Sequence, residues 1–313
     1  MEANRPLPEK LALLHTEQVN PLTADLDRLD TLSMVRRMNS LDREVPLRVG
    51  DEAETIARAI DLVVSRFRLG GRLVYTGAGT SGRLGFMDAA ECPPTFGVPA
   101  DRVTCVMAGG RDAVFKAREL TEDDASQAGK DLEAFGLRPE DVVMAIASSG
   151  RTPYCVGALQ YAASIGAATL SLSCNKNARL SRYAEIAIEV DSGAEAVMGS
   201  TRLKAGTAQK LVLNMISTLS MVQMGHVYKN LMVNVRGFNS KLQDRMRRIF
   251  AEATGNPDRE RASELLEQTD GSLKLAITME LSGATLDEAR QALDAHQGFV
   301  RQALDDLIGR QSP

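Results

Sequence analysis

The sequence predicts an α/β protein whose centre is a doubly wound parallel sheet of five strands, preceded by helices and followed by a small helical domain. From residue 72 to residue 190, short apolar segments alternate with helical patterns, which is typical of a parallel sheet covered by helices on both faces. Two loops rich in glycine and hydroxyl side chains, at 77–82 and 148–152, follow two of the predicted strands. From about residue 239 the chain changes to short helical patterns separated by turn signals.

The N-terminal region is predicted to be an arm followed by two helices. Residues 1–21 contain three prolines and little periodicity, so we expect an extended arm. Residues 23–39 have apolar side chains near one helical face, with Thr23 as the candidate N-cap. A second amphipathic helix is predicted over residues 48–70.

The central region alternates between strands and helices. Strands are predicted at 73–76, 103–107, 142–147, 169–173 and 186–190, with helical stretches near 84–90, 111–134, 153–165 and 176–184. In such sheets, ligands bind outside the carboxyl ends of the strands, where the strand order reverses. The C-terminal helices are predicted at 240–253, 258–268, 271–282, 286–295 and 298–308.

The first loop, at 77–82, has the composition of an anion-binding turn. A helix N-terminus presents backbone N–H groups and a positive dipole end, Gly79 lets the main chain approach a ligand, and Thr80 and Ser81 add hydroxyl donors. We therefore predict a phosphate or sugar-phosphate site. The letters also match G-x-G-x-x-G, but Asp112 comes too late to be the ribose-binding acid of a dinucleotide fold, so NAD is disfavoured.

The second loop ends in a proline that opens a helix, and its hydroxyl groups are the candidate ligands of a phosphate, which the resemblance described below implies is a sugar 6-phosphate. These residues are Ser148, Ser149 and Thr152. A third segment, residues 199–207, adds Ser200 and Lys204 as candidate substrate-binding residues, although a surface role for the lysine is equally plausible. The helix predicted at 208–224 is apolar almost all round, which places it in the core or in a dimer interface.

Composition limits the classes of function. The 313 residues carry a net charge of −4 without a basic block, which argues against nucleic acid or an anionic membrane as partner. No apolar run reaches 18 residues and no signal sequence is visible, so we expect a cytoplasmic protein. The four cysteines and three histidines have no metal-ligand spacing, and no metal site is predicted.

Two glutamates are candidates for acid–base chemistry. Glu91 is followed by Cys92-Pro93-Pro94, where the backbone has little freedom, although a solvated acid at a helix end is the ordinary alternative. Glu122 lies in an acidic run, and the residues themselves do not distinguish it from its acidic neighbours.

Several motifs resemble the signatures of bacterial N-acetylmuramic acid 6-phosphate etherases. They lie at residues 77–85, 91–95, 149–154 and 199–211, with further likeness at 16–21 and 230–234, and the resemblance runs from about residue 16 to residue 305. It implies a sugar isomerase (SIS) domain with a flavodoxin-like sheet, a homodimer, no cofactor, and a place in peptidoglycan recycling. The implied domains are an arm and helix at 1–50, the SIS domain at 51–236 and a helical, UBA-like domain at 237–313.

The resemblance also implies a reaction and two catalytic residues. Enzymes of the family cleave the D-lactyl ether of the substrate, giving N-acetylglucosamine 6-phosphate and D-lactate. Glu91 matches the proton donor, and Glu122 matches the partner carboxylate when the residues are counted from Gly110 without a gap. Arg111 stands where the family often has an acid, and Met198 and Leu203 vary the fourth motif.

Other readings of the fold remain open at this point. A catalytically silent sugar-phosphate sensor, like the glucokinase regulatory proteins that resemble this family, would share the loops but release no product. A sugar-phosphate isomerase would yield no lactate. A transcriptional regulator would need a basic helix-turn-helix, which neither end of the sequence supplies.

Overall fold

The computed structural model describes residues 13–116, 118, 121–235, 237 and 239–309. These residues form two compact units. The first comprises the described parts of Met1–Ala90 and Asp101–Ile216, and the second those of Glu91–Ala100 and Ser217–Pro313. Two segments within the predicted SIS domain, 91–100 and 217–235, therefore belong to the same unit as the C-terminal helices.

The N-terminal segment of the first unit has less α-helix than expected. Residues 1–12 of the predicted arm lie outside the described residues. Three short 3-10 turns follow, at His15–Glu17, Pro21–Thr23 and Leu26–Arg28, before α1 begins at Thr31–Asp42. The predicted helix over 23–39 is therefore wrong in its first two turns.

The N-cap of α1 explains this difference. The side chain of Asp30 accepts hydrogen bonds from the backbone N–H of Ser33 at 3.1 Å and from its hydroxyl at 2.6 Å. An acidic N-cap of this kind fixes the first turn more strongly than Thr23 could seven residues earlier. The helix predicted over 48–70 is likewise divided, into α2 (Val45–Gly50) and α3 (Ala53–Arg68).

The five predicted strands are all present, with ends that differ by no more than one residue. They are β1 (Leu73–Gly77), β2 (Val103–Met107), β3 (Val142–Ala147), β4 (Ala168–Ser173) and β5 (Ile186–Glu189). All pair in parallel in the order β2-β1-β3-β4-β5, which confirms the doubly wound sheet. Every residue of β1, β3 and β4 is buried, as expected of a sheet covered on both faces.

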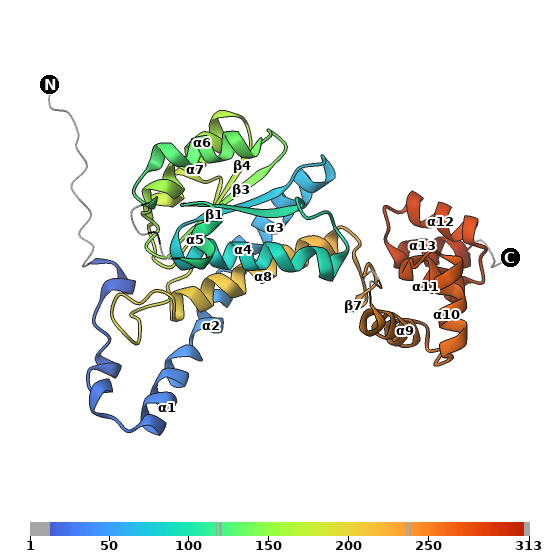
Figure 1. Ribbon diagram of the computed structural model, residues 1–313, viewed down its shortest axis with the longest axis horizontal. Helices are drawn as coiled ribbons and strands as arrows, with labels where there is room; N and C mark the ends of the chain where they lie inside the picture. The colour runs from blue at the N-terminus through green and yellow to red at the C-terminus, as the bar shows by residue number, and fades with distance from the viewer. Residues whose placement is uncertain (1–12, 117, 119–120, 236, 238, 310–313) are drawn as a thin grey trace. The chain divides into compact units, whose positions relative to one another are not determined.

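Helices cover the two faces of this sheet. Figure 1 shows α6 (Ala125–Phe135) and α7 (Pro153–Ser164) on one face, and α4 (Gly79–Phe96) with α8 (Lys204–Gln223) on the other. On the α4 face, a Cβ added at Gly85 would lie only 2.9 Å from the Cβ of Tyr75, so glycine allows α4 to pack directly on β1.

Two of the connecting helices are shorter than predicted. The helix expected over 111–134 is interrupted and forms α5 (Asp112–Phe115) and α6. Asp124 starts α6 by accepting hydrogen bonds from the N–H groups of Ser126 and Gln127 at 2.9 Å and 3.1 Å. The helix expected over 176–184 is only a 3-10 turn, Arg179–Tyr183.

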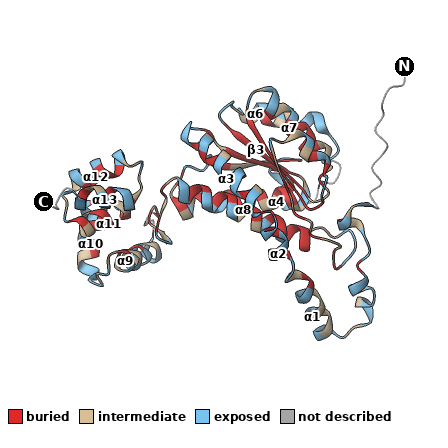
Figure 2. Ribbon diagram, turned by 180° about the vertical axis from the view of Figure 1, so that it is seen from behind, coloured by how far each residue is buried: buried red, intermediate tan, exposed pale blue. Residues whose placement is uncertain are grey.

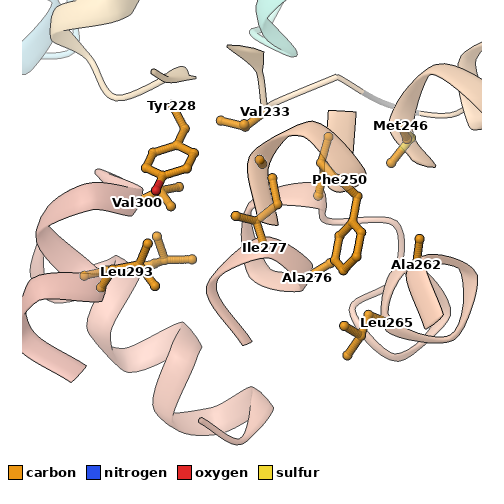
Figure 3. Close-up of a cluster of buried hydrophobic side chains, with 14 of the residues drawn as sticks. Tyr228, Val233, Met246, Phe250, Ala262, Leu265, Ala276, Ile277, Leu293 and Val300 are labelled. Carbon is orange, nitrogen blue, oxygen red and sulfur yellow. The ribbon is translucent and has the colours of Figure 1, made fainter. Parts of the chain in front are cut away.

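The second unit contains a hairpin and the five predicted C-terminal helices. Its elements are β6 (Val227–Tyr228), β7 (Leu231–Met232), α9 (Ser240–Thr254), α10 (Arg259–Gln268), α11 (Leu273–Ser282), α12 (Leu286–Ala295) and α13 (Val300–Gly309). The helices surround Phe250 and Ile277, both completely buried, and Tyr228 of the hairpin packs into the same core (Figure 3). The sequence did not predict the hairpin.

Burial separates these cores from the surface. In Figure 2 the inner strands of the sheet, β3 among them, are coloured as buried, whereas much of α1 is exposed. Within the described part of the chain, none of the helices combines the length and apolar character needed to span a bilayer.

Candidate functional site

The two hydroxyl-rich loops lie at the point where the strand order reverses. Strand β1 has β2 on one side and β3 on the other, so the chain winds away from this point in both directions. The first loop follows β1 and the second follows β3. Ligands of doubly wound sheets bind at this switch point, outside the carboxyl ends of the strands.

The first loop is shorter than the sequence suggested, because α4 already begins at Gly79. Gly79, Thr80 and Ser81 therefore form the first helical turn, where backbone N–H groups have no partner within the helix. A Cβ at Gly82 would lie 2.8 Å from the carbonyl oxygen of Gly77, so the chain turns too tightly here for a side chain. This turn can present its N–H groups to an anion.

The second loop is held rigidly by its main chain. The carbonyl oxygen of Ser148 accepts hydrogen bonds from the N–H of Cys174 at 2.9 Å and from Nδ2 of Asn175 at 3.0 Å. Gly150 has a φ of +67°, and a Cβ there would overlap the Cβ of Ala178. The loop is thus fixed to the end of β4 and to the segment after it.

The side chains of this loop are positioned at the surface of the unit. Ser148, Ser149 and Thr152 are each half-buried, and the hydroxyl of Ser149 accepts from the N–H of Arg151 at 3.3 Å. Pro153 then opens α7, as the sequence predicted.

The N-terminal segment packs against the residue that holds this loop. Thr16 is completely buried, and its hydroxyl accepts from Nδ2 of Asn175 at 3.0 Å. Nearby, Nδ1 of His15 lies 2.9 Å from Oδ1 of Asp191. The motif beginning at Thr16 therefore supports the second loop through Asn175.

A buried glutamine of α8 connects the two loops. Gln209 is 0% exposed, its Oε1 accepts from the hydroxyl of Ser81 at 3.0 Å, and its Nε2 donates to the hydroxyl of Ser148 at 3.2 Å. Sequence analysis did not identify this residue as functional. Its place in the motif at 199–211 is the signal in the sequence that could have found it.

The N-terminus of α8 is occupied by a carboxylate of the protein itself. Glu195 is completely buried and accepts from the N–H groups of Lys204 and Ala205 at 2.8 Å and 2.9 Å. Burial raises the pKa of Glu195, although these hydrogen bonds oppose the increase. Nζ of Lys204 donates to the carbonyl of Ala194 at 3.2 Å, and Ser200 lies half-buried before the helix. The role predicted for Lys204 and Ser200 in substrate binding stays a prediction.

The two candidate catalytic glutamates belong to different units. Glu122 is exposed, and its carbonyl oxygen accepts from the N–H of Tyr154 at 3.0 Å, which places its main chain beside the first turn of α7. Glu91 is exposed on α4, in the part of that helix that belongs to the second unit. Glu119, an acidic neighbour of Glu122, lies outside the described residues.

The end of α4 beyond Glu91 is held by the hairpin region. Nδ2 of Asn234 donates to the carbonyl of Phe96 at 2.7 Å and lies 2.9 Å from Nδ1 of His226. A Cβ at Gly97, whose φ is +63°, would overlap the carbonyl oxygen of Asn234. Among the described residues, no cluster of histidine, cysteine or acidic side chains could hold a metal ion.

Comparison with known proteins identifies the class of domain. Residues 55–163 match the glucokinase regulatory protein N-terminal SIS domain, and residues 126–219 match the SIS domain. A phosphoheptose isomerase from Francisella tularensis has the same fold, with a TM-score of 0.50 and 16% identity over 62% of this chain and all of that one. The protein is therefore an α/β protein with a SIS domain.

Its relatives define the family. The N-acetylmuramic acid 6-phosphate etherase of Geobacillus thermodenitrificans is 51% identical over 292 residues, which cover 93% of this chain and 99% of the relative. The etherase of Mycolicibacterium smegmatis is 49% identical over 94% of this chain and 98% of the relative. The chain belongs to the N-acetylmuramic acid 6-phosphate etherase family, whose members are enzymes of the carbon–oxygen lyase class. The resemblance inferred from the sequence motifs is confirmed.

Proposed function

We propose that this protein cleaves the D-lactyl ether of N-acetylmuramic acid 6-phosphate, giving N-acetylglucosamine 6-phosphate and D-lactate in the recycling of peptidoglycan sugars. The observation that carries the proposal is the 51% identity with an etherase over 93% of this chain. A charged sugar phosphate does not cross a bilayer unaided, so such an enzyme would act in the cytoplasm.

The 6-phosphate would bind at the switch point of the sheet. The hydroxyls of Ser148, Ser149 and Thr152 follow β3 and the N–H groups at the start of α4 follow β1, and Gln209 connects the two loops, so we expect their donors to share one phosphate. Hydrogen bonds to a charged group contribute about 1.5–3 kcal/mol each.

The reaction itself would be an elimination followed by an addition. The ether oxygen on carbon 3 lies β to carbon 1, which is an aldehyde in the open-chain sugar. One carboxylate removes the proton from carbon 2, and lactate leaves from carbon 3 with its ether oxygen, accepting a proton from the second carboxyl group. Water then adds at carbon 3, and carbon 2 regains a proton. In this proposal Glu91 is the proton donor and Glu122 is its partner.

The two glutamates need different environments for this chemistry. One must be protonated and the other ionised near neutral pH, which requires surroundings that separate their pKa values. Both are exposed in the single chain. A second subunit that covered either glutamate would supply the missing desolvation, so we propose a homodimer with its active sites close to the subunit boundary.

The surface of the chain supports this assembly. The i, i+4, i+7 spacing of Met215, Leu219 and Val222 puts these apolar side chains on one face of α8, and all three are exposed in the single chain. In the first unit, an apolar groove of about 450 Å³ is lined largely by N-terminal residues and the 196–198 loop, among them Val19, Leu26, Met34, Val197 and Met198. Sedimentation at micromolar concentration should show a dimer, and only a 33.8 kDa species would contradict it.

Isotope labelling tests the reaction. Product formed in heavy water should carry deuterium at carbon 2, and product formed in oxygen-18 water should carry the label at carbon 3, with none in lactate. Product without deuterium would refute the elimination. Glu91→Gln and Glu122→Gln should each keep the fold and lose about 10²–10⁴-fold in rate, the usual effect of removing a general acid or base.

The second candidate is a non-catalytic sugar-phosphate sensor. It is favoured by the match of residues 55–163 to the SIS domain of the glucokinase regulatory protein. Analysis of products from the purified protein distinguishes the two functions, because a sensor would bind N-acetylmuramic acid 6-phosphate and release no lactate.

The assignment of the partner carboxylate has its own test. Full activity of Glu122→Gln would show that the neighbouring Asp123 or Glu119 is the partner carboxylate.

A further inference from the structure

Gln209 is a buried amide with one end toward each of the two loops. Its Oε1 faces the hydroxyl of Ser81 at 3.0 Å, and its Nε2 faces the hydroxyl of Ser148 at 3.2 Å. A hydroxyl can both donate and accept, so these two contacts alone would allow the amide to be turned by 180°. A third neighbour is needed to fix its orientation.

The thiol of Cys174 supplies this constraint. The Cys174 Sγ donates its proton to the carbonyl of Ala205 at 3.5 Å, and the Gln209 side chain acts on this thiol by lowering its pKa against the effect of burial. Because the thiol proton is already used, the sulfur can only accept, which agrees with the orientation in the structure, where Nε2 faces Ser148 and Oε1 faces Ser81. In this orientation the amino group of Gln209 donates to Ser148.

This orientation gives the two serine hydroxyls different roles. Ser81 has one proton and donates it to Oε1 of Gln209, so its oxygen can only accept from a ligand. Ser148 receives a proton from Nε2, so its own proton must point elsewhere, and no acceptor for it exists among the described residues. A phosphate oxygen carries no proton to give at neutral pH and therefore needs donors.

We propose that Gln209 is a positioning residue that turns the Ser148 proton outward as a donor for the phosphate of the substrate and withdraws Ser81 from that role. This inference rests on the proposed function for the identity of the ligand. The fixed main chain at Ser148 supports it, since Cys174 and Asn175 hold its carbonyl at 2.9 Å and 3.0 Å. Both the backbone and the hydroxyl of Ser148 are then set before the ligand arrives, which lowers the entropy lost on binding.

Two alanine variants separate the serines. The affinity for N-acetylglucosamine 6-phosphate is measured by calorimetry at pH 8, without turnover. Ser148→Ala should weaken binding by about 10- to 100-fold, the value of one hydrogen bond to a charged group, whereas Ser81→Ala should change it by less than about fivefold. Equal losses in the two variants would overturn the proposal, because Ser81 would then be a donor itself.

A double-mutant cycle tests Gln209 directly. The carboxylate of Gln209→Glu would accept from both serines and turn the Ser148 proton inward, so it should weaken binding about as much as Ser148→Ala does. Adding Ser148→Ala to Gln209→Glu should then cost no more than about threefold. A merely structural role for Gln209 would make the two losses multiply, and that result would refute the inference. Gln160→Glu, which places the same charge on the exposed surface of α7, is the control and should bind normally.

The outcomes also separate this inference from the proposed function. A protein that binds the sugar phosphate through Ser148 but releases no lactate would refute the etherase function and leave the role of Gln209 standing. If the protein releases lactate while Ser148→Ala binds the sugar phosphate normally, the role of Gln209 is refuted and the etherase function stands. If Gln209→Glu does not fold, the comparison of Ser81→Ala with Ser148→Ala decides the question alone.

Discussion

Asp141 stabilises the centre of the sheet, and its removal should destabilise the first unit more than that of a surface acid. It lies directly before β3 and its side chain is 0% exposed. It accepts from the backbone N–H of Arg72 at 2.9 Å, from Nε and Nη2 of the same arginine at 3.1 Å and 2.6 Å, and from the N–H of Arg138 at 2.9 Å. Arg72 precedes β1, so this one carboxylate joins the starts of the two central strands.

The expected cost of Asp141→Asn follows from these contacts. The amide keeps one acceptor oxygen but loses the charge, and it leaves Arg72, whose side chain is only 13% exposed, without its counter-ion. Breaking a buried ion pair on one side costs about 3–5 kcal/mol. For a unit of this size that lowers the Tm by about 6–20 °C, at about 2–4 °C per kcal/mol.

The stabilisation that Asp141 provides should also depend on pH. Burial opposes ionisation of Asp141, yet the hydrogen bonds and charge of Arg72 outweigh it and hold its pKa below the ordinary value of 3.8. The ionised Asp141 therefore contributes fully to the free energy of unfolding above its pKa in the unfolded chain. This contribution is lost as the pH falls through its lower pKa in the folded protein. Below that range, Asp141→Asn and the wild type should converge in stability.

Thermal and urea unfolding, followed by circular dichroism, measure these differences. The control is Asp51→Asn, because Asp51 is exposed and pairs with Arg48 only at 3.9 Å, so its loss should change stability by less than about 0.5 kcal/mol. A Tm for Asp141→Asn within 2 °C of wild type at pH 7, about the size of the Asp51 effect, would show that the reasoning about this buried pair is mistaken.

Three further predictions concern packing and reactivity. Gly157→Ala should lower the free energy of unfolding by about 1–3 kcal/mol in a urea titration, because its Cβ would overlap the carbonyl of Ala125 at the start of α6; an unchanged midpoint would contradict this. Burial raises the pKa of Cys155 to about 12 and also raises that of Cys174, so a thiol reagent at pH 8 should modify neither until urea unfolds the protein; rapid labelling of either in the native state would refute it. Asn234→Ala removes the donor to Phe96 and should cost about 1–3 kcal/mol in unfolding of the second unit, measured by hydrogen exchange in α9–α13; unaltered exchange would count against that contact.

The sequence predicted the sheet well because its strands are short apolar runs, and burial on both faces leaves no other pattern for them. Helix boundaries were less predictable where the N-cap residue lies several residues from the start that apolar periodicity indicates. Asp30, and not Thr23, starts α1, and Asp124 starts α6 after a break that apolar periodicity does not reveal. Propensity gives only a weak guide at such positions, and the cap is decisive.

Within the candidate site, the loops were predictable and their connection was not. Gly79, Ser81 and Ser148 belong to local patterns of strand, turn and helix. Gln209 reaches residues 128 and 61 positions away, and such a contact exists only in the tertiary structure. The position of Glu122 depended on counting along a loop, and its catalytic role stays a prediction.

The second unit is built from two segments that lie far apart in the sequence, and this affects how it forms during synthesis on the ribosome. The carbonyl of Phe96 accepts a hydrogen bond from the side-chain amide of Asn234, which lies 138 residues later in the chain. At about 5–20 residues per second, the end of α4 is made about 7–28 s before its partner appears. During that interval the nascent chain carries Glu91 on a segment that has no hairpin to hold it. A chain that stops after the last strand of the large sheet, β5, would retain the two hydroxyl-rich loops but lack Asn234. The C-terminal region therefore supplies the contact that holds the end of the helix carrying Glu91.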